Sequence, residues 1–360
     1  MEKTLLQEYI MQQPALWRAL LTNRERITSA FARQFGALKP DRVILIGSGS
    51  SHYASLMASA VLERVWGVEV TCLVPSEAAN IRLKAHSPLY IAVSQSGVSS
   101  NTYELVCRLT ASGHPVIAVT EREDSPVGQA ASLAVPLLIG QEEIGAKTKG
   151  VTATVLTLVL MALSVCHDKD YCAEMYHALD HLCNDAEENL SRAASWAASC
   201  LDSVLPFRHL YVLGCGNALG AALEGALKLL ETNYLPVSCY PLDEYFHGIQ
   251  NALDDDACLL CLLPPEGGDR ERMIRLVNFA RTVGAHCEII APGKTDISNA
   301  LRLVDADVDT LRPLVYLPAL QTLAADLSSA RSIDTSRRRY PNFFSIMGSK
   351  MEGPSCQSAH

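Results

Sequence analysis

Two clusters of hydroxyl side chains, each placed after a short apolar run, are the residues of this sequence best suited to chemistry. Residues 47–51 read Gly-Ser-Gly-Ser-Ser, and residues 94–102 read Ser-Gln-Ser-Gly-Val-Ser-Ser-Asn-Thr. Glycine lets a backbone approach a ligand closely, and the start of a helix offers free N–H groups and the positive end of its dipole. Serine hydroxyls add further donors, so both turns are suited to a phosphate monoester.

Neither turn matches a nucleotide-binding pattern. In the first, the third glycine of G-x-G-x-x-G would fall at His52, and no Gly-Lys-Ser/Thr follows. One such turn alone is equally consistent with a plain strand-to-helix turn capped by serine. Capping does not explain Ser94, Ser96, Ser99 and Thr102 together, and turns at the carboxyl ends of parallel strands converge. We therefore expect one phosphate site built from both turns.

A third cluster carries titratable groups. Glu224, Lys228 and Glu231 are spaced four and three residues apart, so they share one face of a predicted helix. A solvated charged stripe is the alternative, but Ala, Leu and Gly fill most other positions of this segment, which favours a mostly buried helix. His247 supplies a second group that titrates near neutral pH. Carboxylate and imidazole together would suit acid/base catalysis.

Short apolar runs alternate with helical patterns along the whole chain. The runs lie at residues 41–46, 70–74, 89–93, 116–120, 133–138, 210–213, 257–263, 286–290 and 315–317. This alternation predicts parallel sheets covered by helices on both faces. The expected fold class is α/β, with two tandem doubly wound parallel sheets and a helical lead-in.

The two halves of the chain share one plan, which indicates an internal duplication. VILIGSGSSHYASLMASAVLE matches LYVLGCGNALGAALEGALKLLE: a strand, Gly-x-Gly, then a helix rich in small residues. The predicted divisions are a helical segment at 1–38 that Pro14 breaks into two pieces, an α/β domain at 39–166, a helical connector at 167–205, a second α/β domain at 206–332 and a polar tail at 333–360.

Composition excludes several classes of function. A formal net charge of −9 argues against binding to nucleic acid or an anionic membrane. The N-terminus shows no signal peptide, and the longest apolar stretch, residues 151–166, is too short for a membrane span and reads as a buried core helix. We expect a cytoplasmic protein with no nucleic-acid or membrane partner.

Twelve cysteines are read as free thiols in a reducing compartment, because most lie inside apolar runs. Cys258 and Cys261 form a C-x-x-C within a predicted buried strand, which would place them on opposite faces. No second Cys or His pair with metal spacing follows. We therefore expect neither a metal nor a cofactor.

Taken together, these residues resemble the double SIS (sugar isomerase) domain family. The resemblance covers residues 5–345 and is carried by residues 94–97, 222–228 and 244–248, with a weaker match at 142–149. The chain is similar to the isomerase half of glucosamine-6-phosphate synthase and to the fructosamine-6-phosphate deglycases. The resemblance implies two flavodoxin-like SIS domains and a sugar-phosphate site.

The resemblance also implies roles for single residues. Glu231 would be the acid/base, with Glu224 and Lys228 tuning it or holding sugar hydroxyls. His247 would assist ring opening or proton transfer and would be donated across a dimer interface, which implies a homodimer with a composite active site. The phosphate-binding residues implied are Ser50, Ser51, Ser94, Gln95, Ser96 and Ser99.

The sequence departs from the synthase in two places. A helical lead-in stands where the synthase has its glutaminase, so we expect no use of glutamine. The stretch at 340–345 lacks the lysine of the synthase tail, and Lys350 lies out of register. Three arginines at 337–339 resemble the deglycases more closely. Arg338 is predicted to dock a substrate carboxylate, with a solvated basic tail as the alternative.

The leading functional hypothesis is a deglycase that splits a 6-phosphorylated sugar–amino acid adduct into hexose 6-phosphate and free amine. An amino-sugar-6-phosphate deaminase or aldose–ketose isomerase would use the same residues on a smaller substrate. A catalytically silent sugar-phosphate sensor is a third hypothesis, against which Glu231 and His247 are both present. The predicted partners are a small phosphorylated sugar–amine substrate and a second copy of the chain.

Overall fold

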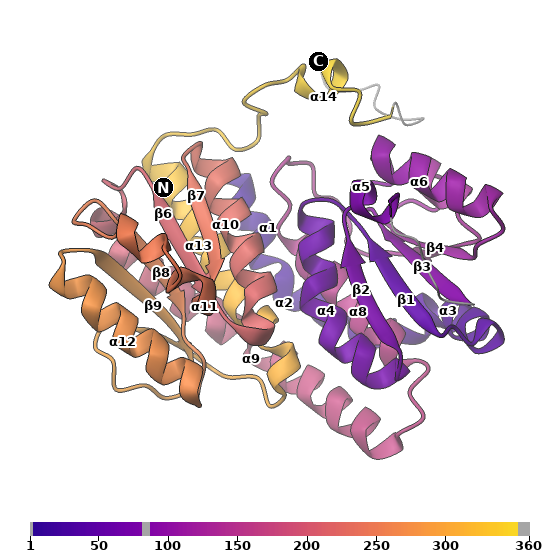
Figure 1. Cartoon of the computed structure of the whole chain (residues 1–360), viewed down its shortest axis with the longest axis horizontal. Helices are drawn as coiled ribbons and strands as arrows, with labels where there is room; N and C mark the ends of the chain where they lie inside the picture. Colours follow the sequence, from indigo (N-terminus) through magenta and orange to yellow (C-terminus); the bar gives the residue numbers. More distant parts are fainter. Residues whose placement is uncertain (1–2, 81–86, 352–360) are drawn as a thin grey trace. The chain divides into compact units, whose positions relative to one another are not determined.

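The structure is a computed structural model that describes residues 3–80 and 87–351 (Figure 1). Its strands are β1 (Arg42–Ile46), β2 (Glu69–Leu73), β3 (Pro88–Val93), β4 (Val116–Thr120), β5 (Leu133–Pro136), β6 (Leu210–Gly214), β7 (Val237–Pro241), β8 (Cys258–Leu262), β9 (His286–Pro292) and β10 (Leu301–Leu303). Its helices are α1 (Leu5–Met11), α2 (Gln13–Thr22), α3 (Arg24–Leu38), α4 (Ser50–Trp66), α5 (Pro75–Ala78), α6 (Ser100–Ala111), α7 (Pro126–Ala130), α8 (Lys149–Leu163), α9 (Lys169–Val204), α10 (Leu219–Asn233), α11 (Leu242–Tyr245), α12 (Gly268–Thr282), α13 (Pro313–Ala330) and α14 (Phe343–Ile346). Short 3₁₀ helices are η1 (Gly216–Ala218), η2 (Ile249–Ala252) and η3 (Asp309–Leu311).

The first sheet has the strand order β2-β1-β3-β4-β5, and all its pairings are parallel. Alternate residues of each strand point to opposite faces. Ile44, Ile46 and Tyr90 pack with Leu105 of α6 on one face. Helices α4 and α8 pack against each other, as do α3 and α8, and α3 and α4 contact strands of this sheet. Both faces are therefore covered, as the apolar runs predicted.

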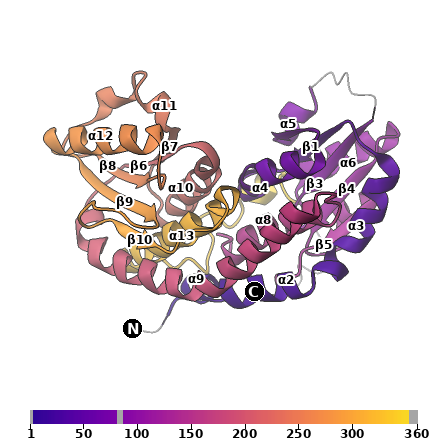
Figure 2. The ribbon, with the colours of Figure 1, turned by 90° about the horizontal axis from the view of Figure 1, so that it is seen from below.

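The second sheet repeats this plan, with the order β10-β9-β8-β6-β7 and parallel pairing throughout. Leu213, Leu259 and Cys261 pack with Met273 of α12 on one face. Helices α10 and α13 pack against each other, and contact β6 and β9 respectively (Figure 2). Cys258 lies three residues from Cys261 and is equally buried, and burial raises the pKa of both thiols. The expected buried thiols of this C-x-x-C are confirmed.

Contacts divide the chain into two compact units, which we call the first-sheet unit and the second-sheet unit. The first-sheet unit comprises Ala15–Glu142, Lys149–Glu174 and Arg337–His360, and the second-sheet unit comprises Met1–Pro14, Glu143–Thr148 and Met175–Ser336. The helical lead-in is thus divided between the two units, with α1 in the second-sheet unit and α3 in the first-sheet unit. Leu6 and Ile10 of α1 pack with Ala325 of α13 in the second-sheet unit. The domain boundaries predicted from the sequence stay predictions.

Most expected elements are present, but three details of the prediction were wrong. The run at 315–317 is not a strand: it lies inside α13, which is buried nearly all round. Strands β7 and β10 had not been predicted. The lead-in forms three helices rather than two, because breaks occur at Gln12, just before Pro14, and again at Asn23.

The apolar stretch at 151–166 is a core helix, as expected. Every residue of α8 is buried, including its threonines. Thr154 Oγ1 donates to the Gly150 carbonyl at 2.7 Å, so its hydroxyl is satisfied inside the helix. Among the described residues, no helix has the length and apolar character needed to cross a bilayer.

Candidate functional site

The carboxyl ends of β1 and β3 form the switch point of the first sheet, because neighbouring strands continue outward from them in opposite directions. The serine turn at 47–51 follows β1, and the second turn follows β3. Asn101 Nδ2, at the start of α6, donates to Ser48 Oγ at 3.2 Å and ties the two segments together. The two hydroxyl-rich turns therefore lie side by side at one edge of the sheet.

The turn at residues 94–97 is closed tightly and depends on Gly97. Gly97 N donates to the Ser94 carbonyl at 3.0 Å, and Val127 N donates to the Gly97 carbonyl at 3.0 Å. Gly97 has φ = +67°, and a β-carbon there would lie 1.9 Å from Ser125 Oγ. Only glycine fits, so the sequence determines the shape of this turn.

Ser94 is the most deeply buried residue of this turn with a hydroxyl group. It is 3% exposed, and its Oγ has no hydrogen-bond partner in the part of the chain that the structure describes. Its backbone N–H is already used, because it donates to the Val119 carbonyl at 3.0 Å. A buried polar group without a partner costs about 1–3 kcal/mol, so this hydroxyl is suited to bind an oxygen supplied by a ligand.

Gln95 is held in a network that extends to the start of α8. Its carbonyl accepts hydrogen bonds from Glu121 N at 2.9 Å and Thr120 Oγ1 at 3.2 Å. Its side-chain amide donates to Glu142 Oε2 at 3.2 Å, and the same oxygen accepts from Gly150 N at 3.1 Å. Gln95 therefore positions the turn, and its side chain lies against α8.

The other serines predicted to bind phosphate lie nearby. Ser50 and Ser51 form the first residues of α4 and are half-buried, after Gly49 at φ = +56°. Ser96 is half-buried within the second turn, and Ser99 precedes α6 without capping it through its side chain. The first turns of α4 and α6 both follow strands of one sheet, and helix N-termini favour anions.

His52, in the first turn of α4, had been noted only as breaking a glycine pattern. Burial lowers the pKa of its imidazole, while the nearby Glu77 carboxylate raises it, and burial prevails. His52 is therefore uncharged at neutral pH. It adds no fixed positive charge beside the serine turn.

The C-terminal segment lies along the turn after β3, which the sequence did not indicate. Met351 N donates to the Val98 carbonyl at 2.8 Å, and Ser100 Oγ donates to the Gly348 carbonyl at 2.7 Å. Ser99 and Lys350 form an antiparallel bridge. Lys350, which the sequence analysis left without a role, thus has its backbone beside the predicted phosphate-binding residues.

Arg338 packs on an aromatic ring of the C-terminal segment. Its guanidinium stacks over the Phe344 ring at 4.8 Å from the centroid, and its side chain is exposed. Lys350 Nζ lies over the same ring, 4.6 Å from the centroid. The structure therefore places Arg338 in a small aromatic–cation cluster of the tail.

The acid/base candidates form a buried charge cluster on α10. Lys228 is 1% exposed and Glu224 is fully buried. Lys228 Nζ lies 3.2 Å from Glu224 Oε1 and also pairs with Glu231 Oε1. Burial alone would lower the pKa of Lys228, but the two carboxylates raise it above its usual range. Lys228 therefore remains charged and holds Glu231, whose side chain is 30% exposed.

Close packing of α10 on α13 explains why this helix is buried. A β-carbon at Gly225 would lie 2.1 Å from Leu320 Cδ1. Asn233 Nδ2 donates to the Ala324 carbonyl at 3.1 Å and secures the end of α10. The expectation of a mostly buried helix, rather than a solvated charged stripe, is confirmed.

His247 lies apart from this cluster. It is exposed, in the turn after α11, next to Gly248 at φ = +117°. No hydrogen bond or ion pair joins it to Glu231 among the described residues. The structure thus brings Glu224, Lys228 and Glu231 together without His247.

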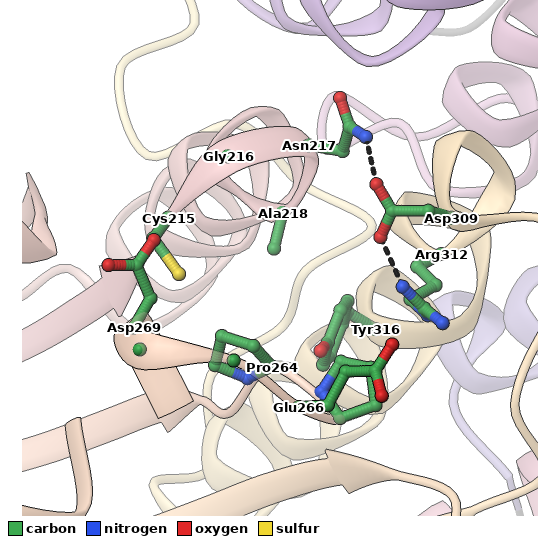
Figure 3. A pocket seen from close by; sticks show the side chains of 13 residues that line it. Cys215, Gly216, Asn217, Ala218, Pro264, Glu266, Asp269, Asp309, Arg312 and Tyr316 are labelled. Atoms are coloured by element: carbon green, nitrogen blue, oxygen red, sulfur yellow. Dashed lines mark hydrogen bonds and ion pairs between the residues drawn. The ribbon is translucent and has the colours of Figure 1, made fainter. Parts of the chain in front are cut away.

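A pocket of about 210 Å³ opens at the switch point of the second sheet, between the ends of β6 and β8 (Figure 3). Asn217 Nδ2 and the Arg312 guanidinium both donate to the Asp309 carboxylate. Glu266 and Asp269 add further negative charge to the lining. None of the predicted site residues lines this pocket, so its acidic wall is distinct from the serine turns of the first sheet.

The comparison with protein families agrees with this arrangement. The sequence pattern of the SIS domain matches residues 38–164 and 206–308, one match for each sheet. The chain belongs to the SIS domain family. The resemblance recognised from the motifs is confirmed, and so is the fold of two tandem α/β SIS domains.

Relatives of this SIS protein share its fold at low identity. A glutamine–fructose-6-phosphate aminotransferase (isomerizing) of Shouchella clausii is 26% identical over an alignment of 309 residues that covers 83% of this chain and 50% of the relative. The chain therefore spans about half the length of such curated relatives. The C-terminal domain of a Francisella tularensis glucosamine-fructose-6-phosphate aminotransferase superposes with TM-score 0.84 at 19% identity, covering 93% and 98% of the two chains. A Thermotoga maritima glucosamine-6-phosphate deaminase superposes with TM-score 0.76 at 19% identity, covering 94% and 98%.

Sequence reasoning missed several residues that shape the second turn, which follows β3. Glu142 had been noticed only as part of a weak motif match, and its position seven residues before α8 gives no local signal of its contact with Gln95. Ser125 caps α7 by accepting from Gly128 N at 3.2 Å, and an S-P pair before a helix is typical of such a cap. No local pattern indicates that residues 348–351 would pair with the turn.

Proposed function

We propose that this SIS protein binds a phosphorylated sugar through the serine turns of its first-sheet unit. The observation that carries the proposal is the buried Ser94 hydroxyl, which has no protein partner among the described residues. Phosphate oxygens accept several hydrogen bonds at once, from hydroxyls and from N–H groups at helix starts. The half-buried Ser51 and Ser96 and the first turns of α4 and α6 would supply further donors.

We propose Glu231 as the acid/base. Its carboxylate is partly exposed, whereas the lysine that holds it is buried. Lys228 is in turn fixed by Glu224, so the Glu231 oxygens have a defined position without being withdrawn from substrate. Such a fixed but accessible carboxylate is suited to move a proton between neighbouring carbons. Glu224 and Lys228 would be positioning residues.

The reaction we propose is deglycation of a 6-phosphorylated ketose that carries an amine on C1. Glu231 removes a proton from C1 as the C2 carbonyl oxygen gains one, which gives an enaminol. Returning the proton to C2 gives an imine between C1 and nitrogen. Water then adds to C1, the C1–N bond breaks, and the products are an aldose 6-phosphate and the free amine. Phosphate binding would keep the open-chain sugar oriented throughout.

His247 and Arg338 keep the roles expected from the resemblance as proposals. His247 is exposed and would act in ring opening, from a second copy of the chain in a homodimer. Arg338 stacks on Phe344 here, so docking a substrate carboxylate would require it to leave that ring.

A second candidate is the interconversion of an amino sugar phosphate and a ketose phosphate. The 26% identity over 83% of this chain to aminotransferases named as isomerizing favours it. It needs the same proton transfer by Glu231 but no adduct with an amino acid. The two candidates differ in the amine that is released.

Product analysis distinguishes them. The protein would be incubated with phosphorylated fructosamine adducts of several amino acids, with glucosamine 6-phosphate, and with fructose 6-phosphate plus ammonia. Coupled dehydrogenases would report glucose and fructose 6-phosphate, and the amine would be measured separately. Hexose phosphate with a free amino acid supports the deglycase; ammonia from glucosamine 6-phosphate alone supports the second candidate. No turnover with any substrate would contradict both.

The Ser94→Ala variant tests the phosphate site itself. One lost hydrogen bond to a charged ligand should weaken glucose 6-phosphate binding by about tenfold, roughly 1.4 kcal/mol. Because the buried hydroxyl has no protein partner among the described residues, the free energy of unfolding should not fall. Ser112→Ala, an exposed serine at the end of α6, is the control. Unchanged calorimetric affinity in Ser94→Ala would contradict this assignment.

A further inference from the structure

Two histidines and an aspartate lie together on the surface of the second-sheet unit, outside the serine turns and the α10 cluster. His177 and His181 are four residues apart on α9, so they share one face, and their ring centroids are 4.0 Å apart. Asp307, in the loop after β10, has its Oδ2 2.7 Å from His181 Nδ1 and 4.0 Å from His177 Nδ1. All three potential ligand atoms lie within 4.8 Å of one another.

The loop that carries Asp307 is fastened to α9. Asn189 lies further along α9 than His181. Its side-chain amide donates to the Val304 carbonyl at 3.0 Å and accepts from Val304 N at 2.7 Å. Arg192 NH1 donates to the Arg302 carbonyl at 2.9 Å. The chain just before Asp307 is thus held against α9, which brings the Asp307 carboxylate close to the two imidazoles.

We propose that His177, His181 and Asp307 bind a divalent transition-metal ion of the zinc type. Two imidazoles and a carboxylate form a nitrogen–oxygen ligand set that Zn²⁺ accepts. Ligand bonds of about 2.0–2.2 Å around a tetrahedral ion need donor atoms roughly 3.3–3.6 Å apart. The contact of 2.7 Å between His181 and Asp307 would have to lengthen and that of 4.0 Å between His177 and Asp307 to shorten, each by less than about 1 Å. The two imidazole nitrogens, which lie within 4.8 Å of each other, would have to come to the same spacing.

Exposure makes this adjustment feasible. The three side chains are 69%, 47% and 50% exposed, so they can rotate without repacking the core. The open side of the cluster also leaves room for water as a fourth ligand. A bound ion would bridge α9 and the loop after β10. That loop continues through Asp309, whose carboxylate lines the acidic pocket, so the ion would also steady one wall of that pocket.

Calorimetric titration of the 360-residue chain with ZnCl₂, after treatment with a chelator, tests the proposal. We expect one site per chain that is weakened about tenfold or more in His181→Gln and in Asp307→Asn. His167→Gln and Asp202→Asn replace exposed residues outside the cluster and serve as matched controls with wild-type affinity. Because the protein has twelve cysteines, only the difference between these variants identifies the site.

Cobalt provides an independent readout. Co²⁺ bound by imidazoles and a carboxylate should give a visible absorption band that is lost in His181→Gln and kept in His167→Gln. Equal Zn²⁺ affinity in the wild type and both cluster variants would overturn the proposal, as would the absence of any site in the wild type. In either case the cluster would serve only to join α9 to the loop after β10, through the hydrogen bond from His181 to Asp307. None of these results depends on the proposed sugar-phosphate chemistry.

Discussion

Lys228 carries a charge on which the second-sheet unit depends. It is buried between Glu224 and Glu231, and Glu224 is fully buried. Replacing the lysine would leave Glu224 as a buried charge without compensation, which typically costs 3–5 kcal/mol. We therefore predict that Lys228→Met lowers the free energy of unfolding by about 3–5 kcal/mol, as measured by urea denaturation.

Two further variants make this prediction specific. Lys294→Met removes an exposed lysine and should change stability by less than about 0.5 kcal/mol. Adding Glu224→Gln to Lys228→Met should recover part of the loss, because the uncompensated charge is then removed. A wild-type unfolding midpoint in Lys228→Met would show that the pair contributes nothing to folding.

His52 predicts a pH dependence of stability. The pKa of its imidazole is lower in the folded protein than the ordinary 6.5. The unfolded chain therefore binds more protons as pH falls through 6.5, and this group makes the folded state less stable below that pH. Above pH 6.5 the effect is absent, because the imidazole is neutral in both states.

Urea unfolding at pH 7.5 and pH 5.5 measures this contribution. The loss of stability between the two pH values should be smaller in His52→Gln than in the wild type. His114→Gln replaces another half-buried histidine of the same unit and is the control, which should keep the wild-type difference. An identical pH dependence in His52→Gln would mean that the environment of His52 does not disfavour its charged form.

At the scale of elements, two glycines inside helices, Gly225 of α10 and Gly36 of α3, differ in the space around them. A β-carbon at Gly225 would meet Leu320 Cδ1 at 2.1 Å and Cβ at 2.9 Å, whereas one at Gly36 has no heavy atom of the described chain within 4 Å. We predict that Gly225→Ala destabilises the protein by about 1–3 kcal/mol through overpacking. Gly36→Ala should stabilise it by about 0.5–1 kcal/mol through helix propensity.

Thermal or urea unfolding of both variants provides the check. Combining Gly225→Ala with Leu320→Ala should give a smaller loss than the sum of the single losses, because the clash partner is removed. Stabilisation by Gly225→Ala would show that α10 and α13 are not in such close contact.

The elements themselves were largely predictable, for identifiable reasons. Runs such as residues 116–120 are short, apolar and β-branched, and β4 matches this one residue for residue. The run at 315–317 was predicted as a strand but lies in α13. Because α13 is buried on nearly all sides, its sequence is apolar throughout and shows no helical periodicity. Strand β7 was missed because Ser238 and Pro241 interrupt its apolar pattern, and β10 because it has only three residues.

At the scale of the whole molecule, local patterns predicted the site in part. The serine turns were expected to meet at one edge because both follow strands that the alternation predicts to be parallel. The strand order that makes them neighbours is seen only in the structure. The burial of Lys228 follows from the apolar residues around it. Contacts between distant segments left no local signal: Gln95 with Glu142, and Ser100 with Gly348. The likeness to known SIS proteins shows the family and fold, and it leaves the substrate to experiment.

We propose that the serine turns bind the phosphate of the substrate and that Glu231 moves the proton. The most direct measurement compares Glu231→Gln with the wild type in two assays: release of amine from a phosphorylated fructosamine adduct, and calorimetric binding of glucose 6-phosphate. Glu271→Gln, an exposed glutamate of α12, is the control. We expect Glu231→Gln to lose at least about a hundredfold in turnover and to keep its affinity for the sugar phosphate within about twofold. Wild-type turnover in Glu231→Gln would contradict this proposal.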